Sequence, residues 1–107
     1  MKMILAVIDK DDAQDVMHNL MKDGFSITKL SSTGGFLRSG NVTILVGVED
    51  DKTQEVLALI KEHSKRRSQL MPLMPGNEMN LLSSMPLEVS VGGATVFVLN
   101  VEQFEKI

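Results

Sequence analysis

One short stretch of the chain combines residue types that could hold a nucleotide. It reads TGGFLRSGN and runs from Thr33 to Asn41. Its adjacent glycines allow backbone N–H groups to converge on an anion. Phe36 offers a ring face on which a nucleobase can stack, and the side-chain amide of Asn41 can both donate to and accept from a base edge. The stretch therefore predicts a small-nucleotide site, and the alternative interpretation is a flexible hairpin connection.

The glycines of this stretch have the spacing of a P-loop, but the residues around them exclude one. A P-loop places Lys and then Ser or Thr directly after its second glycine, and a helix follows. Here Gly40 is followed by Asn41 and Val42, and the next segment is predicted to be a strand. Convergent backbone amides need no helix, so the glycines remain a candidate anion site.

Side chains able to catalyse are isolated from one another. His18 and His63 each lie on a predicted helix without a second histidine, or a carboxylate at metal-binding spacing, on the same face, and we interpret both as surface residues. The serine pairs at 31–32 and 83–84 have no nearby base of the kind that a nucleophile needs. The chain contains no cysteine, which excludes disulfides and thiolate metal sites. We therefore predict no enzymatic activity, no metal and no cofactor.

A strand, a helix and a second strand must position the start of the glycine stretch. The continuous apolar run from Met3 to Ile8 suits a central strand. A helix is predicted to follow, with Asp11 or Asp12 as its N-cap and Gly24 at its C-terminal cap. Residues 25–31 alternate well enough to form a strand. The apolar stripe of the helix consists of Ala13, Val16, Met17, Leu20 and Met21.

The same order of elements repeats about forty residues later in the sequence. Residues 43–48 predict a strand, and Asp50 and Asp51 repeat the acidic cap before an apolar stripe at Val56, Leu57 and Ile60. Residues 88–99 predict a β-rich end, with a bulge or tight bend at 92–93 between two pieces. The order βαββαβ predicts a single α+β domain at 1–107, with a ferredoxin-like antiparallel sheet and two helices on one face.

The predicted sheet needs a cover on its second face. Its central strands are apolar on both sides, and large apolar patches are uncommon on soluble monomers. We therefore expect a homo-oligomer that packs sheet against sheet.

Two loops do not fit the plain fold: the glycine loop at 33–40 and a long segment at about 65–86. The long segment contains all three prolines and four of the eight methionines. Loops of this length tend to be functional or disordered, and methionine suits a surface that adapts to partners. The segment is either a flexible connector or a part of the chain that orders on binding.

Charge and hydropathy exclude several other classes of protein. The net charge of −3 argues against a protein that binds DNA or RNA polymers non-specifically. The apolar run at 3–8 is too short for a signal peptide or for membrane insertion. We therefore expect a cytoplasmic protein.

Three stretches of the chain resemble the cyclic-di-AMP receptor family of PII-like signal transduction proteins. They are ITKLSSTGGFLRSGNVTILVGVED at 27–50, IKEHSKRRSQ at 60–69 and LEVSVGGATVFVLNVEQFEKI at 87–107. The resemblance implies a PII-like homotrimer without catalytic activity, which binds cyclic di-AMP in clefts between subunits. It also implies that the long loop signals the bound state to an unknown protein effector.

The resemblance also assigns roles to individual residues. Gly35, Phe36 and Leu37 would wrap the ligand, Thr28 and Asn41 would hydrogen-bond adenine or phosphate, and Gly47 would let the ligand approach the strand. Phe97 and Gln103 match positions near the C-terminal end that contribute to the pocket. The sequence departs from the family at two positions, because Ser26 stands where Arg is common and Gly24 where Asn is common. Lys29 and Arg38 are candidate replacements for that arginine.

Two functions follow from this resemblance. The first is a sensor that binds cyclic di-AMP at subunit interfaces and relays the bound state through its loops. The second is a PII-like trimeric scaffold that binds a different nucleotide or a protein partner, with cyclic-di-AMP binding weakened by Ser26.

Overall fold

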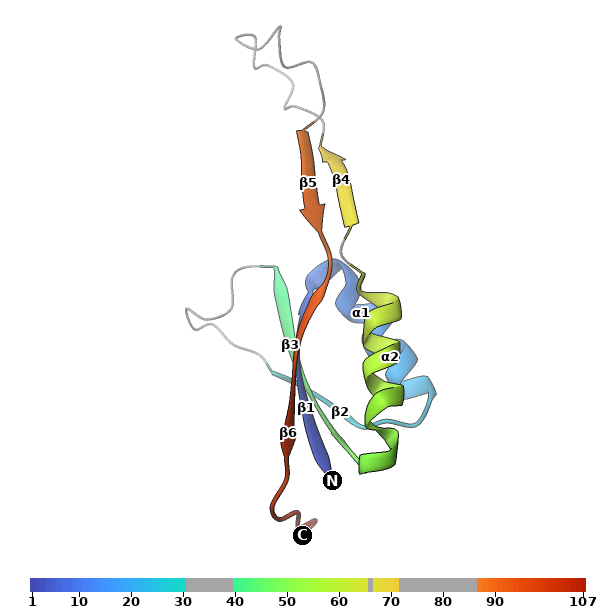
Figure 1. The fold of residues 1–107 in the computed structure, drawn as a ribbon, viewed down its shortest axis with the longest axis vertical. Helices are drawn as coiled ribbons and strands as arrows, with labels where there is room; N and C mark the ends of the chain where they lie inside the picture. The colour runs from blue at the N-terminus through green and yellow to red at the C-terminus, as the bar shows by residue number, and fades with distance from the viewer. Residues whose placement is uncertain (31–39, 66, 72–86) are drawn as a thin grey trace, which may run out of the picture.

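A computed structural model of the chain describes residues 1–30, 40–65, 67–71 and 87–107. Within these residues, the strands and helices follow one another in the order shown in Figure 1. The elements are β1 (Lys2–Asp9), α1 (Lys10–Lys22), β2 (Ile27–Leu30), β3 (Asn41–Val48), the short 3₁₀ helix η1 (Asp50–Lys52), α2 (Thr53–His63), β4 (Arg67–Met71), β5 (Leu87–Val91) and β6 (Ala94–Asn100).

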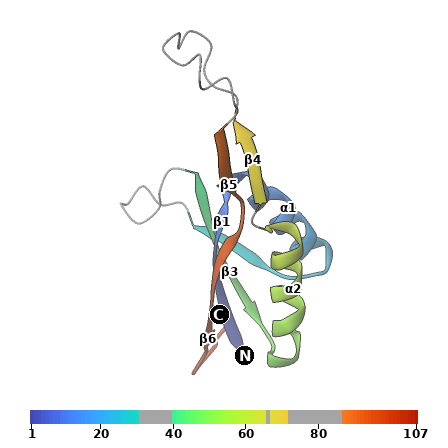
Figure 2. The same cartoon turned by 45° about the horizontal axis from the view of Figure 1, so that its top comes forward.

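Four of the strands form one sheet in the order β2-β3-β1-β6, and all its neighbours pair antiparallel. Both helices pack on the same face of this sheet, as Figure 2 shows. This arrangement confirms the predicted α+β class and is compatible with the predicted ferredoxin-like fold.

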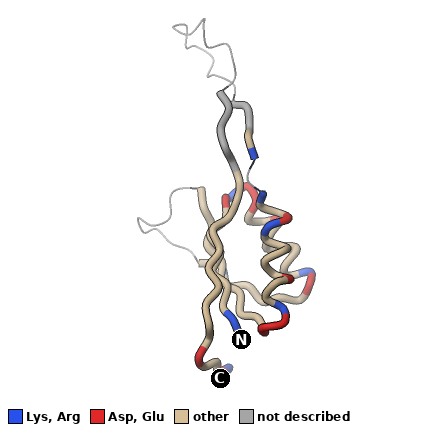
Figure 3. The backbone as a smooth tube through the Cα atoms, viewed as in Figure 1, with Lys and Arg blue, Asp and Glu red and all other residues tan. Residues whose placement is uncertain are grey.

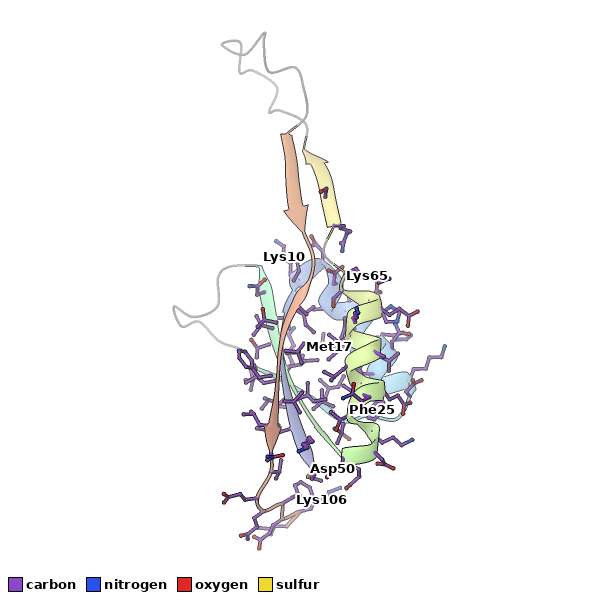
Figure 4. The ribbon with its side chains drawn as sticks, viewed as in Figure 1. Lys10, Met17, Phe25, Asp50, Lys65 and Lys106 are labelled. Atoms are coloured by element: carbon purple, nitrogen blue, oxygen red, sulfur yellow. The ribbon has the colours of Figure 1, made fainter. Side chains whose placement is uncertain are left out.

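The hydrophobic core lies between the sheet and the two helices. Strands β1 and β3 bury alternate residues against the helices, because successive side chains of a strand point to opposite faces. Met17 and Phe25 are partly buried at the edge of this core, and Figure 4 labels both. The largest fully buried side chains are Ile4, Ile8, Leu20, Ile44, Ile60, Val16, Val46 and Val56.

Helix α1 begins earlier than predicted and ends where predicted. Asp9, not Asp11 or Asp12, is the N-cap, because its carboxylate accepts a hydrogen bond from the backbone N–H of Asp11 at 2.9 Å. At the other end Gly24 has φ +91°. The N–H of Gly24 donates to Met21 O and that of Phe25 to Leu20 O, both at 3.0 Å. These two hydrogen bonds together form a Schellman motif, and they confirm the predicted glycine cap.

Helix α2 starts without the acidic cap that the sequence predicts. Asp50 and Asp51 lie in η1, and the N-cap of α2 is Lys52, which makes no side-chain capping bond. Asp50 instead lies 2.9 Å from the amino group of Met1. The hydrogen bond and the charge of that amino group lower the pKa of Asp50. The prediction was wrong because the chain enters α2 through η1, so Asp50 and Asp51 lie within a helical turn and not at the cap position before α2.

Strands β4 and β5 form a separate two-stranded arm that extends beyond the main sheet (Figure 1). The predicted loop at 65–86 is therefore corrected at its first part, since Arg67–Met71 is a strand. The rest of that segment, 72–86, lies outside the described residues, as does the glycine loop at 31–39. Gly92 and Gly93, with φ of +81° and +91°, separate β5 from β6, so the predicted break between two pieces is confirmed, although no tight bend forms there.

Candidate functional site

The face of the sheet opposite the helices is open and largely apolar. Ile44 and Val46 are fully buried under the helices, so Leu45 and Gly47 face the other way. The strand register places Thr28, Leu45, Leu5 and Phe97 in one row across that face. Figure 3 shows that charged residues gather on the helices and near the strand ends. We call this surface the open face.

The open face contains a hollow of about 700 Å³ at the end of the sheet that carries the C-terminal tail. Three residues assigned to the ligand by the resemblance lie together there: Thr28, Gly47 and Gln103. The described residues that line it are Met1, Met3, Ser26, Thr28, Leu45, Gly47, Asn100, Val101, Gln103 and Phe104.

The lining combines hydroxyl and amide groups with apolar side chains. Hydroxyls come from Ser26 and Thr28, and amides from Asn100 and Gln103. The amide of Gln103 donates to Glu105 Oε1 at 3.1 Å, so it reaches the hollow with one hydrogen bond already made. Phe104 adds a ring that is 63% exposed. The hollow therefore offers groups suited to a base edge and a surface suited to a base face.

Positive charge is scarce in this hollow. Among the described residues that line it, none is Lys or Arg. Lys2 approaches it from the side, because its ammonium donates to Asn100 Oδ1. Lys29 pairs with Ile44 in the strand register, so it lies on the helix face and not on the open face with Thr28. Arg38 lies outside the described residues.

The position that a side chain of residue 47 would occupy has no close neighbour among the described residues of the protomer. A Cβ atom at this position would meet no atom of the described residues within 4 Å. Glycine weakens a strand interior, and it often marks a place where a ligand or another backbone comes close. The packing of the protomer therefore does not account for glycine at this position.

Asn41 lies apart from this hollow. It begins β3, six positions before Gly47, which corresponds to roughly 20 Å along a strand. It lines a second hollow of about 340 Å³ together with Asp9, Gly92 and Gly93. Phe97 is 54% exposed on the open face and lines neither hollow. Gly35, Phe36 and Leu37 lie outside the described residues.

The two departures from the family differ in their surroundings. Ser26 lines the larger hollow, so the arginine common at this position would place its cation there. Gly24 instead holds the left-handed cap of α1. Asparagine is the second residue that tolerates this conformation, so the exchange at position 24 has an explanation in helix capping.

Sequence patterns gave no sign of two lining residues, Asn100 and Phe104. Asn100 is the last residue of β6 and Phe104 lies beyond it, where no periodicity constrains the path of the chain. The only signal was that Phe104 is one of four phenylalanines and directly follows Gln103.

The described residues also bear on metal binding and membrane insertion. Among them, no group of three His, Cys, Asp or Glu side chains is placed to hold a metal ion. Within the same ranges, neither helix has the length and hydropathy needed to span a membrane.

Comparison with known proteins identifies the family. The chain is similar to a crystal structure titled as a functionally unknown protein from Pediococcus pentosaceus ATCC 25745, with 40% sequence identity and a TM-score of 0.76. That similarity covers 99% of this chain and 96% of the other. The family model described as cyclic-di-AMP receptor matches residues 1–107, which supports cyclic di-AMP as the ligand. The chain therefore belongs to the cyclic-di-AMP receptor family.

Proposed function

We propose that this protein is a non-enzymatic sensor of cyclic di-AMP, and that its ligand sites form between copies of the chain. The observation that carries the proposal is the family match over the whole chain, together with the gathering of Thr28, Gly47 and Gln103 at one hollow.

The lining chemistry supports a dinucleotide as the ligand. Thr28 would donate to a phosphate or a base nitrogen, and Gln103 would pair with a base edge. Gly47 would allow the ligand to lie against the backbone of β3. Gly35, Phe36 and Leu37 would close around the ligand, with Phe36 stacked on an adenine, which is worth about 1–3 kcal/mol per base.

The open face supports a site between subunits. Leu30, Phe97 and Leu99 are 39%, 54% and 44% exposed, and such an apolar surface favours self-association. Asn41 lies roughly 20 Å from Gly47, so a dinucleotide held at Gly47 would meet the Asn41 of another copy and not that of the same protomer. In a homotrimer, the Asn41 end of one copy would meet the hollow of another.

The arm and the segment that follows β4 would report the bound state to a protein effector. The arm stands apart from the main sheet, which leaves it available to a partner (Figure 1). In this proposal DNA and RNA polymers are not ligands, in keeping with the net charge of −3.

Calorimetric titration with cyclic di-AMP, cyclic di-GMP and ATP tests the proposal. Cyclic di-AMP should bind best, and a micromolar dissociation constant would correspond to about −8.2 kcal/mol. Thr28→Val removes a hydroxyl and keeps the shape, so it should weaken binding roughly 2- to 10-fold, the net value of one hydrogen bond. Thr28→Ser keeps a hydroxyl at the same position and serves as the matched control. No heat with cyclic di-AMP would overturn the proposal.

The scaffold that binds a different ligand is the second candidate function, and one observation favours it. With Ser26, the described part of the lining lacks the cation that the family commonly supplies at this position to a dianionic ligand. The same titration separates the two functions, because a scaffold would give a trimer by light scattering without a response to cyclic di-AMP.

A further inference from the structure

The arm is attached to the core by an ion pair at its base. Asp12 on α1 is only 6% exposed, and Arg67 is the first residue of β4. Arg67 Nη2 donates to Asp12 Oδ1 at 3.0 Å and Nη1 donates to Oδ2 at 3.2 Å. The carboxylate raises the pKa of Arg67. A two-pronged contact of this kind fixes direction as well as distance, which a single point charge does not.

The second connection between core and arm lies against the same ion pair. Gly92 follows β5 with φ +81°, and a Cβ atom at this position would lie 2.5 Å from Arg67 Nη1 and 2.9 Å from Asp12 Oδ2. Arg67 Nη1 also donates to the carbonyl oxygen of Lys65, 3.2 Å away, just before β4. The chain therefore enters and leaves the arm at one point, and only glycine fits there.

The first turn of α1 also contacts the start of β3. The N–H of Lys10 donates to Gly40 O at 2.6 Å, and Asp9 pairs with Asn41 in the register of β1 and β3. Figure 4 shows Lys10 and Lys65 at the end of the core from which the arm extends. One helical turn thus joins the Asn41 end of β3, which belongs to the proposed ligand site, to the base of the arm.

We propose that Asp12, Arg67 and Gly92 form a latch that holds the arm in one direction on the core, and that the first turn of α1 carries movement at Gly40–Asn41 to this latch. The inference deepens the relay step of the proposed function and rests on that function only for its ligand-dependent part. Asp12 and Arg67 are positioning residues in this scheme, since they act on the arm and not on the ligand.

Spin-label distance measurements test the latch without any ligand. The chain has no cysteine, so Gln14→Cys on α1 and Ser68→Cys on β4 introduce a unique pair of labels at exposed positions. Dilution with unlabelled protein removes distances between copies. The latched arm should give a narrow distance distribution.

Two independent changes should release the arm. Asp12→Asn removes the charge, and Gly92→Ala forces the ion pair apart, so both should broaden the distribution. Asp11→Asn removes an exposed charge from the same helical turn, and Gly24→Ala places alanine at φ +91° over open space, so both should leave it narrow. Narrow distributions in both latch variants would overturn the latch.

The link through α1 is tested with cyclic di-AMP. Lys10→Pro removes the N–H that donates to Gly40, and proline suits the first position of a helix. Asp9 has φ −55° and ψ 137°, the extended conformation that a residue before proline adopts. Lys10→Ala keeps the N–H and is the matched control.

Cyclic di-AMP should shift the distance between the two labels in the unchanged protein and in Lys10→Ala. Lys10→Pro should bind cyclic di-AMP without that shift. The proposed link through α1 would be overturned if cyclic di-AMP shifted the label distance in Lys10→Pro. It would also be overturned if the unchanged protein bound cyclic di-AMP and its label distance did not shift. Failure of the unchanged protein to bind in calorimetry would instead overturn the proposed function, and the ligand-free distances would still decide the latch.

Discussion

Replacing Gly47 by alanine should separate ligand binding from folding. The position is in the interior of β3, carries no positive φ and has open space where the new methyl group would lie. Exchanging glycine for alanine at a compatible position stabilises a protein by about 0.4–1 kcal/mol, because it restricts the unfolded chain. For a domain of this size, that gain corresponds to a rise of roughly 2–8 °C in melting temperature.

The same methyl group should obstruct the ligand. If cyclic di-AMP lies against the β3 backbone, the added group overpacks the contact, and overpacking costs about 1–3 kcal/mol. The dissociation constant should therefore rise roughly 5- to 150-fold. Gly47→Val should raise it further without loss of folding, since valine suits a strand.

Thermal unfolding at fixed protein concentration and calorimetry on the same samples measure both effects. Gly24→Ala is the matched control, because its left-handed φ of +91° should cost about 1–2 kcal/mol of stability and leave affinity unchanged. Light scattering checks that Gly47→Ala keeps the oligomeric state. A lower melting temperature for Gly47→Ala would refute the packing argument, and an unchanged affinity would refute the placement of the ligand.

Three further predictions concern the open face and the helix cap. Ser26→Arg should tighten binding of cyclic di-AMP in calorimetry, because it adds a cation to a hollow whose described lining residues carry none; unchanged affinity would mean that another cation already contacts the ligand. Leu99→Asp should convert the oligomer to monomers in light scattering and keep the circular dichroism of the fold, since Leu99 is 44% exposed in the protomer; an unchanged mass would move the interface elsewhere. Gly24→Asn should keep the melting temperature within a few degrees, because asparagine also tolerates a left-handed cap, and a loss as large as that of Gly24→Ala would contradict this.

Local patterns in the sequence were enough to predict the core of the fold. Helix periodicity and strand alternation depend on neighbours within a few positions, and they located both helices and the four strands of the main sheet. The caps were less predictable, because several acidic residues compete at each helix start. Asp9, and not Asp11 or Asp12, is the N-cap because the chain turns directly from β1 into α1.

Interactions between distant residues explain what the sequence did not predict. Strand β4 exists through its pairing with β5, which starts sixteen residues after Met71, and its own residues show no strand pattern. Asp12 and Arg67 are 55 positions apart, so neither residue alone indicates the ion pair. Alternation along β3 could have placed Gly47 on the open face, whereas the path of the tail that brings Gln103 there depends on tertiary packing.

Two glycines show how a structural requirement can be told from a functional one. Gly92 adopts φ +81°, and a side chain there would collide with an ion pair, so the fold itself requires glycine. Gly47 has neither constraint, yet glycine in a strand interior lowers stability. A residue that weakens its own element without a reason in the protomer indicates a requirement from outside the protomer, either a ligand or a second copy of the chain. Gly47→Ala distinguishes these two sources, because loss of the ligand contact lowers affinity at constant mass, whereas loss of a subunit contact lowers the mass itself.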